Sequence, residues 1–173
     1  MATKTVWKID QAHSEVGFKV KHMMISTVSG SFEKFEGYLE TTTDDFTDAV
    51  FNFSAEIDSV NTNNKDRDTH LKSDDFFNAT EYPKLKFVSK SFNGSELKGD
   101  LTIRDVTKEI SLDVDYNGTA VDAYGQTKAG FELEGSVNRK DFKLNWNAIT
   151  EAGNVVVSDK VKLIISVQFI KQA

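Results

Sequence analysis

The segment Arg67–Pro83, RDTHLKSDDFFNATEYP, is where the pattern of the chain changes. On both sides of it apolar and polar residues alternate, which is typical of half-buried β-strands, and within it the alternation stops. Leu71 follows Arg67 by four residues, and Ser73 precedes two acids, so the segment predicts a short helix and then a second helix capped by Ser73. The two adjacent phenylalanines that follow could form a lid over a barrel, or they could pack an ordinary two-helix connection onto a sheet.

Composition indicates a soluble globular protein. The 173 residues suit one domain, predicted to span residues 1–173 with a helical insert at about 64–80. A net charge of −6 argues against nucleic acid as a partner, because phosphate binding needs clustered basic residues. The absence of cysteine excludes disulfides, thiolate metal sites and a cysteine nucleophile. No apolar run is long enough for a membrane span or a signal peptide, which favours a cytoplasmic location, or a periplasmic one if a leader was removed.

Eight long segments of alternating apolar and polar residues predict an all-β fold. Each segment has one apolar face, and the chain contains too little helix to cover so many faces, so the sheet must close on itself. Long strands joined by tight turns favour an extended antiparallel eight-stranded β-barrel, whose interior side chains can fill or which can hold one small ligand. The predicted strands cover residues 16–22, 28–41, 49–57, 84–92, 97–103, 110–116, 129–137 and 161–169.

The connections are predicted from local signals. The apolar phase shifts by one residue within 28–41, which a β-bulge near Glu33 or Lys34 would correct. The pair Asn93-Gly94 supplies the positive φ angles of a type I′ hairpin turn, and Asn117-Gly118 predicts a second turn.

Because small residues occur on the predicted inward faces, the barrel interior could be either hollow or filled. These residues would create an apolar void that a ligand could occupy, unless large neighbours compensate. The alternative is that Phe18, Phe53, Phe87 and Phe131 fill these gaps from opposite strands. The small inward residues are Gly37, Ala55, Ser89, Ser91, Gly99, Ala129 and Gly135.

Motifs of enzymatic chemistry are mostly missing. The chain has no nucleophile elbow, phosphate-binding loop, dinucleotide fingerprint or zinc-protease motif. The three histidines have no partners at metal-ligand spacing, so no metal site and no cofactor is predicted. On the predicted helix, Arg67 shares a face with His70, and Asp66 pairs with His70. These charges could fix the helix to the barrel rim, or they could clamp the polar head group of an apolar ligand.

Four stretches in order along the chain resemble the YceI-like family: WKIDQAHSEVGFKVKHMMISTVSGSFEKFEG from Trp7, RDTHLKSDDFFNATEYPKLKF from Arg67, LKGDLTIRDVTKEISLDV from Leu97 and NRKDF from Asn138. The resemblance implies a lipocalin-like barrel around a long hydrophobic channel, binding of polyisoprenoids or other long amphiphilic lipids, and often a dimer. The chain departs from the family pattern at Asp105 and Lys143, where glycine is common. The family motifs match at His13, Ser14, His22, Arg67, Asp68, His70, Leu71, Asp75, Phe76 and Phe77.

The resulting prediction is a non-enzymatic carrier of a long-chain lipid, polyisoprenoid or fatty-acyl-like. Hydrocarbon burial would drive binding at about 0.8 kcal/mol per methylene, so affinity should rise with chain length until the channel is full. Arg67 and His70 would meet the head group, while Phe76 and Phe77 would close one end. The predicted ligand-binding residues are Phe18, Val20, His22, Phe35, Phe53, Arg67, His70, Phe76, Phe77, Phe87, Leu101, Phe131, Leu133 and Ile165.

Two other functions compete with this prediction. An enzyme could use the same channel, with His22 or His70 as acid or base on a lipid substrate. A filled barrel could instead serve as a protein-interaction module or form a homodimer through apolar residues on its outer face. The candidates for such a surface are Val88, Val156, Ile164 and Ile170.

Overall fold

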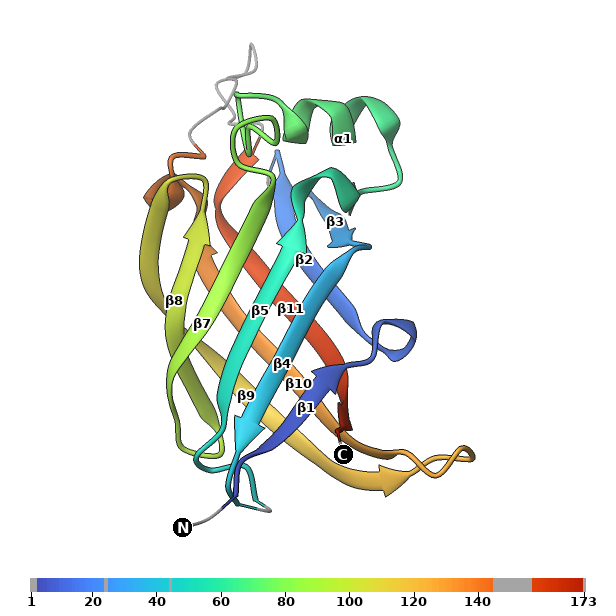
Figure 1. Cartoon of the computed structure of the whole chain (residues 1–173). Coiled ribbons are helices and arrows are strands. Elements are labelled where there is room, and N and C mark those ends of the chain that lie inside the picture. Colours follow the sequence, from blue (N-terminus) through green and yellow to red (C-terminus); the bar gives the residue numbers. More distant parts are fainter. Residues whose placement is uncertain (1–2, 24, 44, 145–156, 173) are drawn as a thin grey trace.

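The computed structural model describes residues 3–23, 25–43, 45–144 and 157–172 (Figure 1). Most of these residues lie in β-strands, and the others include one α-helix and three short 3-10 helices. The strands are β1 (Thr5–Ile9), β2 (Glu15–His22), β3 (Ser26–Phe32), β4 (Phe35–Thr41), β5 (Val50–Glu56), β6 (Val60–Asn61), β7 (Lys84–Phe92), β8 (Glu96–Ile103), β9 (Val106–Val121), β10 (Thr127–Asn138) and β11 (Val157–Lys171). The helices are α1 (Lys65–Lys72), η1 (Gln11–His13), η2 (Ile57–Ser59) and η3 (Arg139–Phe142).

These strands form a closed antiparallel barrel. The hydrogen-bonded ring runs β1-β4-β5-β7-β8-β9-β10-β11, and pairing of β1 with β11 closes it. Strands β2, β3 and β6 extend the same wall, because β2 pairs with β11 beyond its contact with β1, and β3 lies between β2 and β6. The prediction of an all-β, eight-stranded barrel with a helical insert is confirmed.

The phase shift within residues 28–41 proved to be a break between two strands, and the predicted β-bulge is wrong. A bend at Glu33 and Lys34 separates β3, which pairs with β2, from β4, which pairs with β1. Hydrogen bonds link this bend to the neighbouring break between β5 and β6: Glu33 N donates to Ser59 O (3.1 Å) and Glu56 N to Lys34 O (2.9 Å). The wall therefore turns a corner where adjacent strands bend together.

The two Asn-Gly pairs play different roles. Gly94 has a φ of 97° in the β7–β8 connection, but Asn93 does not share the positive φ of a type I′ turn; its side chain accepts from the N–H groups of Ser95 and Glu96 instead. Asn117-Gly118 is not a turn. It lies inside β9, where the pairing with β10 slips by one residue, and Gly118 supplies the positive φ of 99°. A β-bulge and a hairpin turn both select glycine, so the pair alone does not distinguish them.

The helical insert is a single helix followed by turns. Helix α1 is capped by Asn64, whose side-chain oxygen accepts from Arg67 N (3.0 Å). Ser73 ends this helix rather than starting a second one, and its hydroxyl donates to His70 O (2.5 Å). Residues 73–82 form turns, so the predicted second helix is wrong. Figure 1 shows α1 lying across one end of the barrel.

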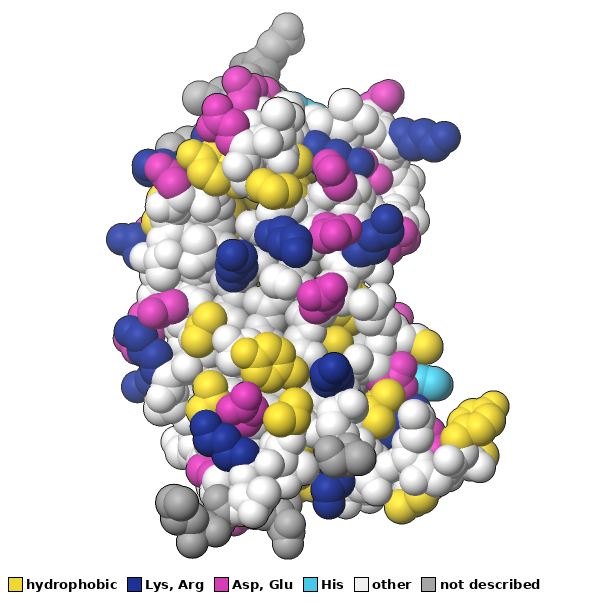
Figure 2. Space-filling view, in the orientation of Figure 1, with side chains coloured by type: hydrophobic (Ala, Val, Ile, Leu, Met, Phe, Trp, Pro, Cys, Tyr) yellow, Lys and Arg dark blue, Asp and Glu magenta, His cyan; other side chains and the backbone are white. Residues whose placement is uncertain are grey.

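Apolar side chains on the outer wall gather on β4, β5 and β7. Tyr38, Val50 and Val88 are each more than two-fifths exposed. Figure 2 shows apolar side chains on this face surrounded by Lys, Asp and Glu.

An ion-pair network joins the β1–β2 corner to the β9–β10 hairpin. Asp10 receives hydrogen bonds from Ala12 N (3.1 Å) and Lys128 Nζ (2.8 Å), and it pairs with His13 Nδ1 (2.9 Å). Lys128 also reaches Asp122 (3.4 Å). Burial raises the pKa of Asp10, but the hydrogen bonds from Lys128 and His13 outweigh burial and hold the pKa below its usual range.

We expect this network to stabilise the fold only while Asp10 is ionised. Because the pKa of Asp10 is lower in the folded state, its contribution is present above the unfolded pKa of about 3.9 and is lost as the pH falls through the folded value. The Asp10→Asn variant should therefore be less stable than the parent at neutral pH, and the difference should shrink below about pH 4. Urea unfolding of both proteins across this range measures it; an equal difference at about pH 7 and about pH 3 would contradict the role of the charge.

Candidate ligand-binding cavity

The barrel encloses a cavity of about 570 Å³ with an almost wholly apolar lining. It reaches from aromatic residues of β5 and β11 to α1 and the insert. Its size falls within the range of about 300–1,000 Å³ that is typical of ligand pockets. Its apolar wall includes Val16, Phe32, Phe51, Leu85, Leu97, Ile110, Leu112, Val161, Leu163, Val167 and Phe169.

Twelve of the fourteen predicted ligand-binding residues line this cavity. Phe35 and Phe131 do not. Phe35 is 4% exposed and packs against Phe53, which lines the cavity (ring centroids 6.1 Å apart). Phe131 lies in an aromatic cluster at one end of the barrel. The twelve are Phe18, Val20, His22, Phe53, Arg67, His70, Phe76, Phe77, Phe87, Leu101, Leu133 and Ile165.

The interior is hollow although aromatic rings cover some of the small inward residues. The ring of Phe87 lies over Gly99, where an added Cβ would come within 2.6 Å of it, and Phe18 covers Gly30 in the same way. Both rings also line the cavity. The aromatics therefore lie along the wall instead of crossing the barrel, and space remains in the centre. Ser91, predicted to face inward, is exposed because the β7–β8 pairing shifts register between Ser89 and Ser91.

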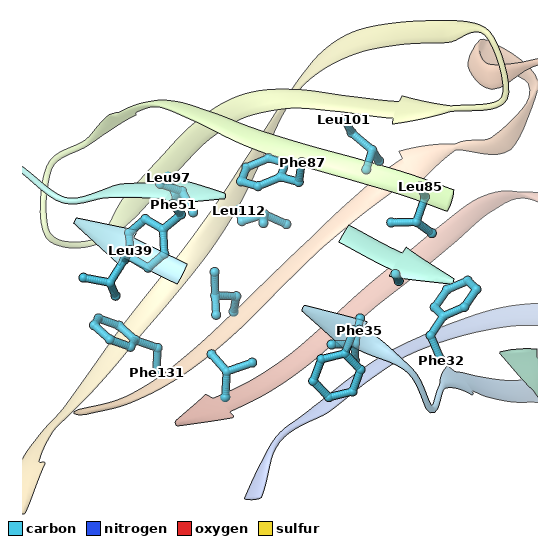
Figure 3. Packing of buried hydrophobic residues seen from close by; sticks show 14 of the residues in the cluster. Phe32, Phe35, Leu39, Phe51, Leu85, Phe87, Leu97, Leu101, Leu112 and Phe131 are labelled. Carbon is cyan, nitrogen blue, oxygen red and sulfur yellow. The ribbon is translucent and has the colours of Figure 1, made fainter. Parts of the chain in front are cut away.

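An aromatic layer closes the barrel at the end far from α1. Phe131 stands at its centre, with ring centroids 5.7 Å from Phe51, 5.9 Å from Phe169 and 5.4 Å from Phe46. Figure 3 shows Phe131, Phe51 and Leu39 together at one end of the packed interior, with Phe32 and Leu85 at the other. We call Phe131, Phe51 and Phe169 the aromatic floor.

Phe46 lies in a loop and packs against this floor. The alternating pattern of the sequence did not predict this role. Phe46 lies between β4 and β5 with a φ of 63°, yet only 1% of it is exposed. Its ring packs against Trp7 (5.1 Å) and Tyr116 (5.2 Å). Asp48 fixes the same loop by accepting hydrogen bonds from Thr41, Thr42 and Thr43. The residue belongs to no strand, so alternation could not reveal it.

The polar part of the lining gathers at the α1 end. Arg67 donates from Nε to Thr62 Oγ1 (2.8 Å) and from Nη2 to Thr62 O (2.5 Å). His70 pairs with Asp75 (2.8 Å), not with Asp66 as the helical spacing predicted. Further polar lining residues at this end are Lys21, His22, Asn64 and Asp66. The cavity therefore has an apolar body and a polar end.

A family model for the YceI-like domain matches residues 7–169. The chain belongs to the YceI-like family. A UPF0312 protein of Staphylococcus epidermidis is 37% identical over 166 residues, which cover 95% of this chain and 97% of the relative. A UPF0312 protein of Staphylococcus aureus strain MSSA476 is 38% identical with the same coverage.

Solved structures share the barrel. The Campylobacter jejuni YceI protein is 36% identical, with a TM-score of 0.72 and coverage of 95% of this chain and 96% of the other. Burkholderia cenocepacia BcnA is 19% identical with a TM-score of 0.78, covering 92% of this chain and 98% of that one. A polyisoprenoid binding domain from Saccharophagus degradans is 14% identical with a TM-score of 0.73, covering 96% and 98%. The last two likenesses show the fold alone.

The two departures from the YceI-like pattern meet in space. Lys143 has a φ of 63°, the left-handed conformation that favours glycine, and Asp105 follows Arg104, with a φ of 57°, in the β8–β9 turn. Lys143 Nζ bonds to Asp105 Oδ2 (3.1 Å), so the two replacements pair with each other. Lys143 lies between Phe142 and Leu144, which both line the cavity. This exposed pair thus lies beside the cavity wall.

Arg139 is a further residue that the periodicity did not single out. It lines the cavity and is 3% exposed. Burial lowers the pKa of its guanidinium, and the carboxylate of Asp159 opposes that shift. Its donors reach Ser158 O (2.9 Å) and Leu144 O (2.5 Å), so it joins η3 to the start of β11.

Two features are absent from the described part of the chain, a cluster of metal-binding side chains and a helix that could span a membrane. Within it, no group of three or more His, Asp or Glu side chains is arranged to hold a metal ion. None of its helices has both the length and the apolar character needed to cross a membrane.

Proposed function

We propose that this YceI-like protein binds a long-chain apolar or amphiphilic lipid inside the barrel and carries it without transforming it. The observation that supports the proposal most strongly is the cavity of about 570 Å³, which lies within the barrel and is lined almost entirely by hydrocarbon. An apolar cavity of this size has few polar groups to hold water, so a hydrocarbon chain is its favoured occupant. Each methylene that enters contributes about 0.8 kcal/mol before ordering costs.

The ligand would lie with its polar end toward α1. The aromatic floor offers no polar side chain, whereas Lys21, His22, Arg67 and His70 line the opposite end. The donors of Lys21 and Arg67, which lie at this end together with Asp66, would favour a head group that accepts hydrogen bonds. Contact with Arg67 and His70 would then compete with their present partners, Thr62 and Asp75.

A polyisoprenoid or a fatty-acyl-like chain fits this proposal equally well. The Saccharophagus degradans domain, similar in fold, is described as a polyisoprenoid binding domain, which supports a long, thin apolar ligand. A possible homodimer through the outer apolar face and a cytoplasmic location stay predictions. Of the residues predicted for that face, Val88 is exposed, Ile164 and Ile170 are half-buried, and Val156 lies outside the described residues.

Mass spectrometry of an organic extract from the purified protein tests the proposal. We expect a long-chain lipid in stoichiometric amount, absent from a mock purification of cells that lack the protein. Delipidated protein should take up the same lipid again, and recovering it unchanged after incubation separates a carrier from an enzyme that uses His22 or His70. An empty extract, together with failure to bind any prenyl or acyl chain, would favour the interaction module instead.

A further inference from the structure

Phe131 occupies a distinct position between the cavity and the end of the barrel. Its ring meets Phe51 and Phe169 edge to face, at interplanar angles of 89° and 80°, and both of these residues line the cavity. On its other side it meets Phe46 and stacks on Tyr116 (5.1 Å, 29°). It is 1% exposed, so the ring is fully enclosed.

The spacing along β10 places this ring directly below the cavity wall. Leu133 is the next inward residue toward α1, about 7 Å further along the strand, and it lines the cavity. The inward face of β10 therefore passes from open cavity to solid aromatic packing within one alternation. The rings packed around Phe131 are aromatic on both sides, so the volume of the aromatic floor limits how deep an apolar chain can go.

We propose that Phe131 sets the maximum length of the hydrocarbon chain that the barrel accepts. This inference rests on the proposed function and adds to it a residue that determines specificity. A chain that enters from the α1 end gains burial with each methylene until its terminal methyl group meets Phe51 and Phe169, which border the cavity and pack against Phe131. A longer chain must leave methylenes outside or displace Phe51 and Phe169, and Phe131, held from behind by Phe46, leaves these two rings no space to move into.

Removing the ring should lengthen the cavity toward Phe46 and Tyr116. In Phe131→Ala, fatty acids whose chains are too long for the cavity of the parent protein should bind better, by about fourfold for each methylene newly buried. The affinity maximum should therefore move to longer chains, while the affinity of short chains stays as in the parent. Phe131→Leu, which keeps more of the packing, should shift the maximum less.

Phe46→Ala provides a matched control. Phe46 is also 1% exposed and its ring lies 5.4 Å from that of Phe131. Neither ring borders the cavity, but Phe131 packs against Phe51 and Phe169, which do, whereas the ring partners of Phe46 (Trp7, Tyr116 and Phe131) do not. Both alanine variants lose one buried aromatic ring and should be destabilised by similar amounts, seen as similar decreases in the urea midpoint of unfolding. Only Phe131→Ala should change the chain-length profile, so a general loosening of the barrel would appear in both variants.

The experiment titrates a series of saturated fatty acids of increasing length into parent, Phe131→Ala, Phe131→Leu and Phe46→Ala proteins, with displacement of a fluorescent apolar probe as readout. A longer optimum in Phe131→Ala alone supports the inference. Identical profiles for parent, Phe131→Ala and Phe131→Leu would overturn it while leaving lipid binding intact. A parent protein that binds none of the acids would instead overturn both this inference and the acyl form of the proposed function.

Discussion

Replacing Leu133 by tryptophan should reduce the affinity for long-chain lipids by roughly a hundredfold or more. Leu133 lines the cavity one inward position above the aromatic floor, between its cross-strand neighbours Val114 and Ile165. An indole at this position projects into space that the hydrocarbon would occupy. If about four methylenes lose their burial, the loss is roughly 3 kcal/mol, which corresponds to more than two orders of magnitude in Kd. Titration with the lipid found in the extract measures the effect.

The variant should stay folded because the indole enters a cavity instead of packed core. Overpacking a filled core costs about 1–3 kcal/mol, and an open site should cost less. Val88→Trp is the control: it adds the same side chain to the outer face of β7, where Val88 is 47% exposed, and should leave affinity unchanged. Full lipid affinity in a folded Leu133→Trp protein would show that this face of β10 does not meet the ligand.

The sequence predicted the barrel well because its strands carry one-sided polarity. Alternation fixes which side chains face inward, and for β7 to β11 it gave the correct strands with shifts at their ends. It did not locate the corner at Glu33 and Lys34, because a bulge and a strand break shift the apolar phase in the same way. Only the pairing partners of β3 and β4 distinguish the two.

Local signals were weakest in the insert. Ser73 followed by two acids is a good helix start, but the residues before it already form α1, and the hydroxyl of Ser73 completes that helix. Serine is found at both ends of helices, so the residue alone does not show which role it takes. The spacing of His70 predicted Asp66 as its partner, but the turns after α1 bring Asp75 closer. Tertiary folding of the turns therefore decided both outcomes.

Alternation predicts the face of a residue but not its depth along the barrel. Phe131 and Leu133 share an inward face, yet one belongs to the floor and the other to the cavity wall. What separates them is Phe46, which comes from a loop and fills the end of the barrel. Phe35 likewise faces inward but packs against Phe53 and does not reach the cavity. The predicted inward residues therefore matched most of the cavity wall, but they did not show where along the barrel the cavity ends.

The second large effect is expected in stability, from the buried guanidinium of Arg139. Arg139→Met keeps most of the apolar stem and removes the donors that reach Ser158 O, Leu144 O and Val157 O. Methionine cannot donate hydrogen bonds, so each of these carbonyl oxygens would lose its partner. Leaving a buried acceptor unpaired costs about 1–3 kcal/mol. With three acceptors affected, we expect the free energy of unfolding to fall by about 3 kcal/mol or more, measured by urea unfolding.

Lys140→Met separates this effect from a simple loss of charge. Lys140 is adjacent in η3 and pairs with the same carboxylate, Asp159, at 3.3 Å, but its side chain is 48% exposed. Exposed ion pairs contribute about 0–1 kcal/mol, so this variant should be almost as stable as the parent. Equal small losses in both variants would mean that the attraction to Asp159, and not the bonds to the backbone, is what Arg139 provides. A large loss in Arg139→Met alone would identify Arg139 as the residue that holds η3 and the start of β11 together beside the cavity.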